Sequence, residues 1–135
     1  MNLHDSPASE FKSKRGLRRI AKALRYSLDG LRSAWRSEHA FRQELFIVVP
    51  AIFLALVLPV SALEKAILIA SALLILIVEL LNSSIEAVVD RISLERHPLS
   101  KNAKDFGSAA VTLTILCAAL IWGVILFPIL SSMLG

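Results

Sequence analysis

The sequence predicts an all-α membrane protein in which three transmembrane helices follow an N-terminal amphipathic helix. The 135 residues are 56% hydrophobic with a mean hydropathy of +0.66, which is too apolar for a soluble domain of this length. Residues 45–63 and 106–135 contain no charged side chain, and each run meets the length of roughly 20 residues that crosses a bilayer. A third apolar run begins at Ala66, and it reaches that length only if Glu79 lies near the interface or faces protein.

The N-terminal part of the chain is predicted to hold a tail and one surface helix. Residues 1–15 show no apolar periodicity, so we expect a mobile tail there. Over residues 16–37 most basic side chains lie away from an apolar set with helical spacing, namely Leu17, Ile20, Ala21, Leu24, Leu28, Leu31 and Trp35. This pattern is typical of an amphipathic helix that lies on an anionic leaflet. A cytosolic helix packed on a soluble partner is the alternative.

Residues 38–135 are predicted to form the membrane domain, with spans at about 42–60, 64–92 and 102–132. Pro59 and Ser61 indicate a tight turn between the first two spans. His97 and Pro98 interrupt the chain before the third span, and Ser100 is its expected N-cap. The small residues at 107–110 open the third helix and favour close packing against another helix.

Basic residues are unevenly distributed around the predicted spans. Ten of the fifteen Lys and Arg precede Glu44, four lie between residues 91 and 104, and only Lys65 lies between the first two spans. Because cytoplasmic flanks are rich in Lys and Arg, the N-terminus and the second connection are expected to be cytoplasmic. No fold for base readout accompanies the basic N-terminus, so no nucleic-acid partner is expected.

The residues that follow the middle apolar run carry the clearest sign of chemistry. Glu79, Asn82 or Ser83, Glu86 and Asp90 recur at steps of three or four residues and therefore share one helix face. Carboxylates are rare inside a span unless they have a function. A face rich in acceptor oxygens can hold a hard cation and accept a proton. The alternative for Glu79 is a hydrogen bond or ion pair between helices.

Further charged residues flank the first and third spans. Glu38 and Glu44 precede the first span, and Lys104 and Asp105 lie just before the third. Two or three carboxylates and a lysine suit a metal-bridged polyphosphate, since Mg²⁺ takes oxygen ligands and Lys provides positive charge for phosphate. For each residue taken alone, a solvated helix end is the alternative. No P-loop or protein-kinase motif is present.

Three stretches of the sequence together carry a resemblance to a known family. The longest runs Glu79-Leu-Leu-Asn-Ser-Ser-Ile-Glu-Ala-Val-Val-Asp-Arg91, and the others lie within residues 30–44 and 95–110. With these motifs the chain resembles the bacterial integral-membrane diacylglycerol kinase family from about residue 19 to residue 122. Pro50 and Pro98 depart from the family's pattern. The resemblance implies a homotrimer in the bacterial inner membrane, with active sites shared between neighbouring subunits at the cytoplasmic surface.

The resemblance also implies roles for individual residues. Glu79 matches the catalytic carboxylate, with Asn82 beside it, and Glu38 and Glu86 match glutamates that bind Mg²⁺. Nucleotide binding is implied for Arg19, Tyr26, Glu38, Glu86, Glu95, Arg96, His97, Lys104 and Asp105. Contact with the lipid substrate is implied for Arg19, Arg32, Ala40, Phe41, Arg42, Gln43, Glu44, Glu79, Ser108 and Trp122.

The implied function is the ATP-dependent phosphorylation of the primary hydroxyl of diacylglycerol to phosphatidic acid, a reaction of lipid metabolism. Glu79 is expected to accept the hydroxyl proton as the oxygen attacks the γ-phosphoryl group of ATP. One alternative is a related enzyme that phosphorylates a polyprenol such as undecaprenol. The other is a non-enzymatic membrane protein, such as a scaffold or a proton-relay subunit, which leaves the second Glu on the same face unexplained.

Overall fold

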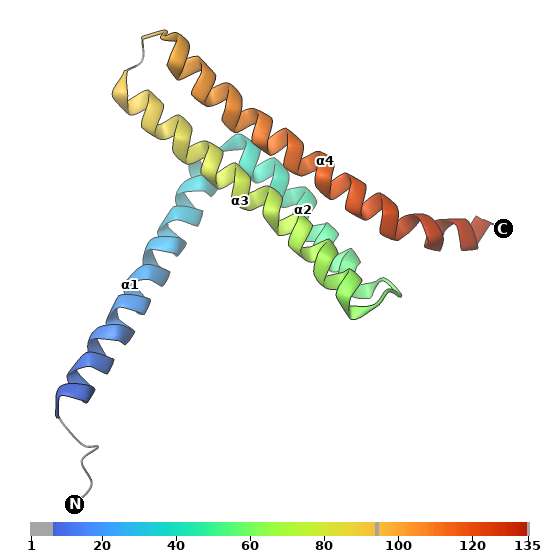
Figure 1. The fold of residues 1–135 in the computed structure, drawn as a ribbon, viewed down its shortest axis with the longest axis horizontal. Helices are drawn as coiled ribbons and strands as arrows, with labels where there is room; N and C mark the ends of the chain where they lie inside the picture. The colour runs from blue at the N-terminus through green and yellow to red at the C-terminus, as the bar shows by residue number, and fades with distance from the viewer. Residues whose placement is uncertain (1–6, 94, 135) are drawn as a thin grey trace, which may run out of the picture. The chain divides into compact units, whose positions relative to one another are not determined.

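The chain is described by a computed structural model, which covers the backbone of residues 7–93 and 95–134 and the side chains of residues 16–93 and 95–132 (Figure 1). Four α-helices follow one another over these residues: α1 (Pro7–Ser37), α2 (His39–Val57), α3 (Ala62–Ile92) and α4 (Pro98–Leu134). The contacts divide the chain into two compact units, Met1–Ser37 and Glu38–Gly135. We refer to the second unit as the bundle.

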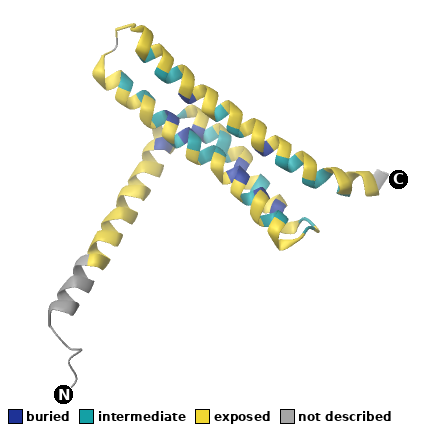
Figure 2. Cartoon of the chain, viewed as in Figure 1, coloured by how far each residue is buried: buried dark blue, intermediate teal, exposed yellow. Residues whose placement is uncertain are grey.

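The N-terminal unit consists of one long helix over its described residues. α1 begins at Pro7, nine residues before the start predicted at Gly16, so the predicted tail boundary is corrected for residues 7–15. Proline is well suited to the first helical position, and Ala, Glu, Lys and Arg favour a helix even where no apolar periodicity is present. Residues 1–6 of the predicted tail lie outside the described residues. The large apolar side chains of α1 are exposed (Figure 2), among them Leu17, Ile20, Leu24 and Leu28.

The bundle is organised around α3, which contacts both α2 and α4. The buried residues of α2, Phe41, Val48 and Ala55, are spaced seven apart, and those of α3 include Leu68 and Ala72. A spacing of seven keeps one face of a helix against its neighbour when the two axes are nearly parallel or antiparallel. The buried core is small, and most apolar side chains on the three helices are exposed (Figure 2), as suits helices that face lipid or other subunits.

The connection between α2 and α3 is held by local hydrogen bonds. Ser61 caps α3 in a capping box, because its hydroxyl accepts from the Glu64 N–H at 3.2 Å and its own N–H donates to the Glu64 carboxylate at 2.8 Å. The Lys65 ammonium donates to the carbonyl of Leu56 at 2.7 Å. The turn predicted around Pro59 therefore lies between Val57 and Ala62.

The connection between α3 and α4 differs from the prediction in one respect. α4 begins at Pro98, and the Nδ1 atom of His97 accepts a hydrogen bond from the Leu99 N–H at 3.2 Å. The prediction that Ser100 caps this helix is wrong. Proline at the first position has no N–H to satisfy and a backbone angle already suited to a helix, so the helix begins three residues earlier than a cap at Ser100 implies.

Three helices are long and apolar enough to cross a membrane: His39–Val57 with 19 residues, Ala62–Ile92 with 31 and Pro98–Ser132 with 35. The predicted fold class, an all-α membrane protein with three spans, is confirmed. The first of these three spans, α2, ends at Val57 rather than near residue 60, because the backbone of Leu58, which precedes Pro59, is already extended. Pro50 lies inside α2 and is exposed.

Candidate active site

The carboxylate at the centre of the predicted site is buried inside the bundle. Glu79 lies in the second half of α3 with 3% of its surface exposed, and Asn82, one turn further on, is 9% exposed. The three-residue step places both on one helix face, and the same face buries Leu68 and Ala72 nearer the start of α3. A carboxylate among apolar neighbours costs free energy unless it is paired or has a chemical role.

Asn82 links this buried region to Glu86. Its side-chain Nδ2 donates to Oε1 of Glu86 at 3.2 Å. Its Oδ1 atom is buried and has no hydrogen-bond partner, and the same is true of Oε2 of Glu44. Buried acceptors are nearly always satisfied in native proteins, so each of these two oxygens is available to a donor or a cation of a bound ligand.

Two further glutamates interact electrostatically with the region of Glu79. They are Glu44 of α2 and Glu38, the N-cap residue of that helix. The charges of Glu86 and Glu38 both act on Glu79, and the charge of Glu79 acts on Glu44. Glu38 is the N-cap residue of α2, and its side chain makes no capping hydrogen bond to that helix. We call Glu38, Glu44, Glu79 and Glu86 the carboxylate cluster. Like charges repel one another in an apolar environment, so a bound cation would stabilise the cluster.

The carboxylate oxygens of the cluster suit a hard divalent cation that is also coordinated by phosphate oxygens. Among the described residues, no three His, Cys, Asp or Glu form a group that could enclose a metal ion. Mg²⁺ does not require such a group, because it is commonly held by one or two carboxylates together with water and substrate phosphates. The donors available in the cluster are carboxylate oxygens, which suit Mg²⁺ rather than a soft metal.

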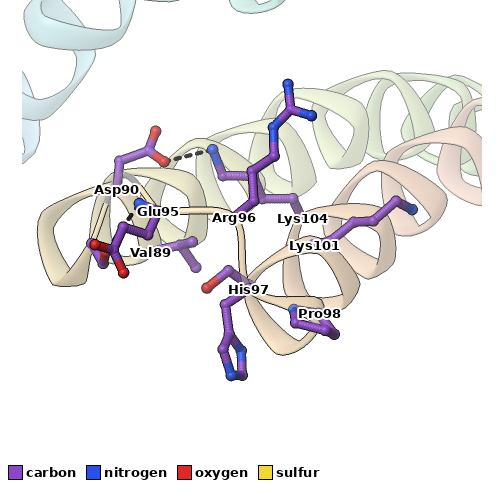
Figure 3. Close-up of a pocket in the computed structure, with 10 residues that line it drawn as sticks. Val89, Asp90, Glu95, Arg96, His97, Pro98, Lys101 and Lys104 are labelled. Carbon is purple, nitrogen blue, oxygen red and sulfur yellow. Dashed lines mark hydrogen bonds and ion pairs between the residues drawn. The ribbon is translucent and has the colours of Figure 1, made fainter.

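An open pocket of about 610 Å³ lies where α3 ends and α4 begins (Figure 3). It is lined by four of the residues predicted to bind nucleotide, namely Glu95, Arg96, His97 and Lys104. Lys104 pairs with Asp90 through a contact of 2.6 Å between Nζ and Oδ1, and the two side chains are 38% and 51% exposed. The pocket thus offers positive charge from Lys104, Arg96 and Lys101 at one end of the bundle.

Helix geometry relates the pocket to the carboxylate cluster. Eleven residues separate Glu79 from Asp90, which corresponds to about 16 Å along the axis of α3. Glu86 lies between them on the same face. Glu86 is therefore nearer to the pocket than Glu79 along the axis of α3.

Some predicted residues are placed elsewhere. Asp105 forms an ion pair with Lys101 and does not line the pocket. Phe41 is 3% exposed and belongs to the core. Ala40, Gln43 and Ser108 are exposed, and Arg42, Glu44 and Trp122 are half-buried. In the N-terminal unit, Arg19, Tyr26 and Arg32 are exposed on α1, and Arg32 lies 3.5 Å from Asp29.

Ser108 and Trp122 lie at different depths of α4. Fourteen residues separate them, which corresponds to about 21 Å along the helix. One small headgroup cannot contact both side chains, although a long acyl chain can reach from one to the other.

The sequence did not predict the contacts that two residues near the site make. Asp90 belongs to the predicted acceptor stripe, yet its pairing with Lys104 across fourteen residues was not expected. Gly107 of α4 was predicted only as a small packing residue, whereas it is buried directly against the side chain of Asn82. The spacing of Asp90 from Glu86 was an available signal. Nothing in the local sequence of Gly107 indicates which side chain it faces.

A carboxylate cluster around the buried Glu79 and a pocket lined by Lys104, Arg96 and Lys101 lie on one three-span membrane bundle. Comparison with known proteins identifies the family. The sequence model of the prokaryotic diacylglycerol kinase family matches residues 25–126. The chain therefore belongs to that family, and both the predicted family and the prediction that it is an enzyme of the diacylglycerol kinase kind are confirmed.

Individual relatives agree with the family match. The chain is 55% identical over 118 residues to diacylglycerol kinase from Pseudomonas aeruginosa, covering 87% of this chain and 96% of the relative. It is 52% identical over 112 residues to the enzyme of the same name from Escherichia coli K12, covering 83% and 92%. A diacylglycerol kinase from Helicobacter pylori 26695 is 47% identical over 109 residues, covering 81% and 85%.

Proposed function

We propose that this protein transfers the γ-phosphoryl group of ATP to the primary hydroxyl of diacylglycerol and releases phosphatidic acid and ADP. The reaction takes place at the cytoplasmic surface of the bacterial inner membrane, with the N-terminus on the cytoplasmic side. The single observation that carries this proposal is the burial of Glu79, 3% exposed, in a chain that belongs to a lipid kinase family. A base inside the bundle is needed only if the hydroxyl arrives from the bilayer.

Glu79 is the general base in this proposal, and Asn82 orients the groups around it. The lipid hydroxyl donates a hydrogen bond to the Glu79 carboxylate, and the proton moves to that carboxylate as the oxygen attacks the γ-phosphorus. The bond between the γ-phosphorus and the bridging oxygen breaks, and ADP leaves with the electron pair. General-base catalysis needs a carboxylate within hydrogen-bond reach of the attacking hydroxyl, and the burial of Glu79 supports this by keeping competing water away.

Glu38 and Glu86 would hold Mg²⁺, and both act electrostatically on Glu79. When bound, the ion would supply positive charge that offsets the negative charge developing on the nucleotide phosphates. The hydrogen bond from Asn82 to Oε1 of Glu86 holds that carboxylate in one orientation and leaves its other oxygen for a ligand.

The nucleotide occupies the pocket at the start of α4. Lys104 exchanges its contact with Asp90 for a contact with phosphate, while Glu95, Arg96 and His97 line the space for the rest of the nucleotide. Asp105 contributes after it separates from Lys101. Nucleotide contact is also proposed for Arg19 and Tyr26. The half-exposed ion pair of Lys104 supports this exchange, because such pairs contribute little to stability and open easily.

The lipid approaches laterally through the membrane. Its contacts are proposed to come from Arg32, the N-terminal turns of α2 at residues 40–44, and Ser108 and Trp122 of α4, with Arg19 near the headgroup. The functional assembly is a homotrimer with active sites shared between subunits, and α1 lies on the anionic leaflet. The exposed apolar surface of the bundle supports an arrangement in which lipid and neighbouring subunits cover the three helices.

The proposal is tested with the purified full chain in lipid vesicles, supplied with Mg²⁺ and γ-labelled ATP. Diacylglycerol and undecaprenol are offered in separate reactions. Label in diacylglycerol alone, abolished by a chelator of divalent cations, is the expected result. Label in undecaprenol alone would identify the chain as a polyprenol kinase, and label in neither lipid would contradict a kinase function.

A further inference from the structure

Gly107 on α4 lies against the side chain of Asn82 on α3. A methyl group placed on Gly107 would lie 2.1 Å from Oδ1 of Asn82, 3.2 Å from its Cγ and 3.7 Å from its Cβ. All three of the nearest heavy atoms therefore belong to the Asn82 side chain. The constraint comes from one flexible side chain rather than from the backbone of α3.

The orientation of the Asn82 amide depends on that space. Nδ2 donates to Oε1 of Glu86 at 3.2 Å, so Oδ1 must point to the opposite side, where it meets Gly107 and finds no hydrogen-bond partner. An unsatisfied buried acceptor is unfavourable by itself. It persists because Gly107 makes room for the oxygen and the hydrogen bond to the Glu86 carboxylate is gained in return.

We propose that Gly107 is a positioning residue, whose missing side chain leaves the space that keeps the Asn82 amide turned toward Glu86. Gly107 touches no reacting group and acts only through Asn82. This inference rests on the proposed function, in which Glu86 holds Mg²⁺ and lies beside the general base Glu79. A methyl group at residue 107 drives the Asn82 amide into another rotamer, since its far end is free to rotate, and the fold survives.

The first measurement does not depend on activity. The chain contains three asparagines, Asn2, Asn82 and Asn102, so labelling with ¹⁵N-asparagine gives three side-chain amide signals, and Asn82→Ala assigns one of them. Gly107→Ala is compared with Gly123→Ala, which adds the same methyl group to the same helix with nothing within 4 Å. Gly107→Ala should shift the Asn82 signal and leave the other two unchanged, whereas Gly123→Ala should shift none.

The second measurement is a double-mutant cycle on kinetics. Gly107→Ala should lower kcat about tenfold and raise the Mg²⁺ concentration needed for half-maximal rate about tenfold, as for loss of a residue that orients a metal ligand. In the Asn82→Ala background the two closest contacts of the methyl group are removed and the remaining Cβ lies at an ordinary 3.7 Å, so Gly107→Ala should cause no further loss of kcat and no further change in melting temperature.

An unshifted Asn82 signal in Gly107→Ala overturns the inference, and so does an equal loss caused by the methyl group with and without the Asn82 side chain. Both outcomes are distinct from failure of the proposed function. That failure is absence of lipid phosphorylation by the unsubstituted chain, whereas the amide signals and melting temperatures are measured without any substrate.

Discussion

The two polar regions of the bundle differ in how their charges are satisfied. Glu79 at the centre of the carboxylate cluster is buried, the other three glutamates are half-buried, and Oε2 of Glu44 has no hydrogen-bond partner. The pocket at the start of α4 is open, and its two lysines form ion pairs, Lys104 with Asp90 and Lys101 with Asp105. A bound cation would offset the negative charge of the first region, whereas the two lysines of the second must exchange partners when they bind phosphate.

This difference predicts which substitutions should have the largest effect on the reaction rate. A buried group is surrounded by a medium of low dielectric constant, so a change of its charge has a large effect on the reaction. An exposed ion pair is screened by water and contributes on the order of 0–1 kcal/mol. Loss of a group from the cluster should therefore affect the chemical step, and loss of a group from the pocket should affect nucleotide binding.

The largest effect is expected for Glu79→Gln. The amide keeps the shape of the carboxylate but cannot accept the hydroxyl proton, so kcat should fall about 10²- to 10⁴-fold, the usual contribution of a general base. The KM for ATP should change little, because the pocket is untouched. Transfer of γ-label from ATP to diacylglycerol in vesicles measures both, and turnover close to that of the unsubstituted chain would exclude Glu79 as the base.

The next effect is expected for Glu86→Gln, which removes a proposed Mg²⁺ ligand. The Mg²⁺ concentration needed for half-maximal rate should rise about 10- to 100-fold, while saturating Mg²⁺ restores part of the rate. The matched control is Glu64→Gln on the same helix, because glutamine still serves in a capping box. If both variants keep the Mg²⁺ dependence of the unsubstituted chain, Glu86 is not a ligand.

A smaller effect is expected for Lys104→Ala in the pocket. Removal of a charged hydrogen-bond donor to phosphate should raise the KM for ATP about tenfold and leave the KM for diacylglycerol unchanged. Lys65→Ala is the control, since Lys65 bonds to the Leu56 carbonyl at the α2–α3 connection. A larger effect on kcat than on the KM for ATP would show that Lys104 belongs functionally with the carboxylate cluster.

The smallest effect is expected for Asp90→Asn. Lys104 then loses the carboxylate that competes with phosphate, and the KM for ATP should fall by at most about fivefold, the limit for an exposed ion pair. In a Lys104→Ala background the substitution should have no effect. Initial-rate measurements over a range of ATP concentrations decide this, and a tenfold or larger rise in KM would assign Asp90 a direct role in nucleotide binding.

The sequence predicts most of the architecture because its signals are short-range. Apolar runs, the Pro59–Ser61 turn and the acceptor stripe of α3 each depend on residues within a few positions of one another. The errors also lie at local boundaries. α1 begins at Pro7 rather than Gly16, and α4 begins at Pro98 without a cap from Ser100. In both helices a proline occupies the first helical position, where its fixed backbone angle favours an earlier start. The trimer, the orientation and the roles of the site residues stay predictions.

Composition and helical spacing predict three membrane-spanning helices and place Glu79, Asn82, Glu86 and Asp90 on one helix face. Sequence similarity alone is also enough to identify the family. The packing of the helices in the structure is needed to see which of those groups are buried, that Lys104 pairs with Asp90, and that Gly107 faces Asn82. The physical reason is that helical periodicity places residues on a face, whereas the register between two packed helices depends on many side chains at once.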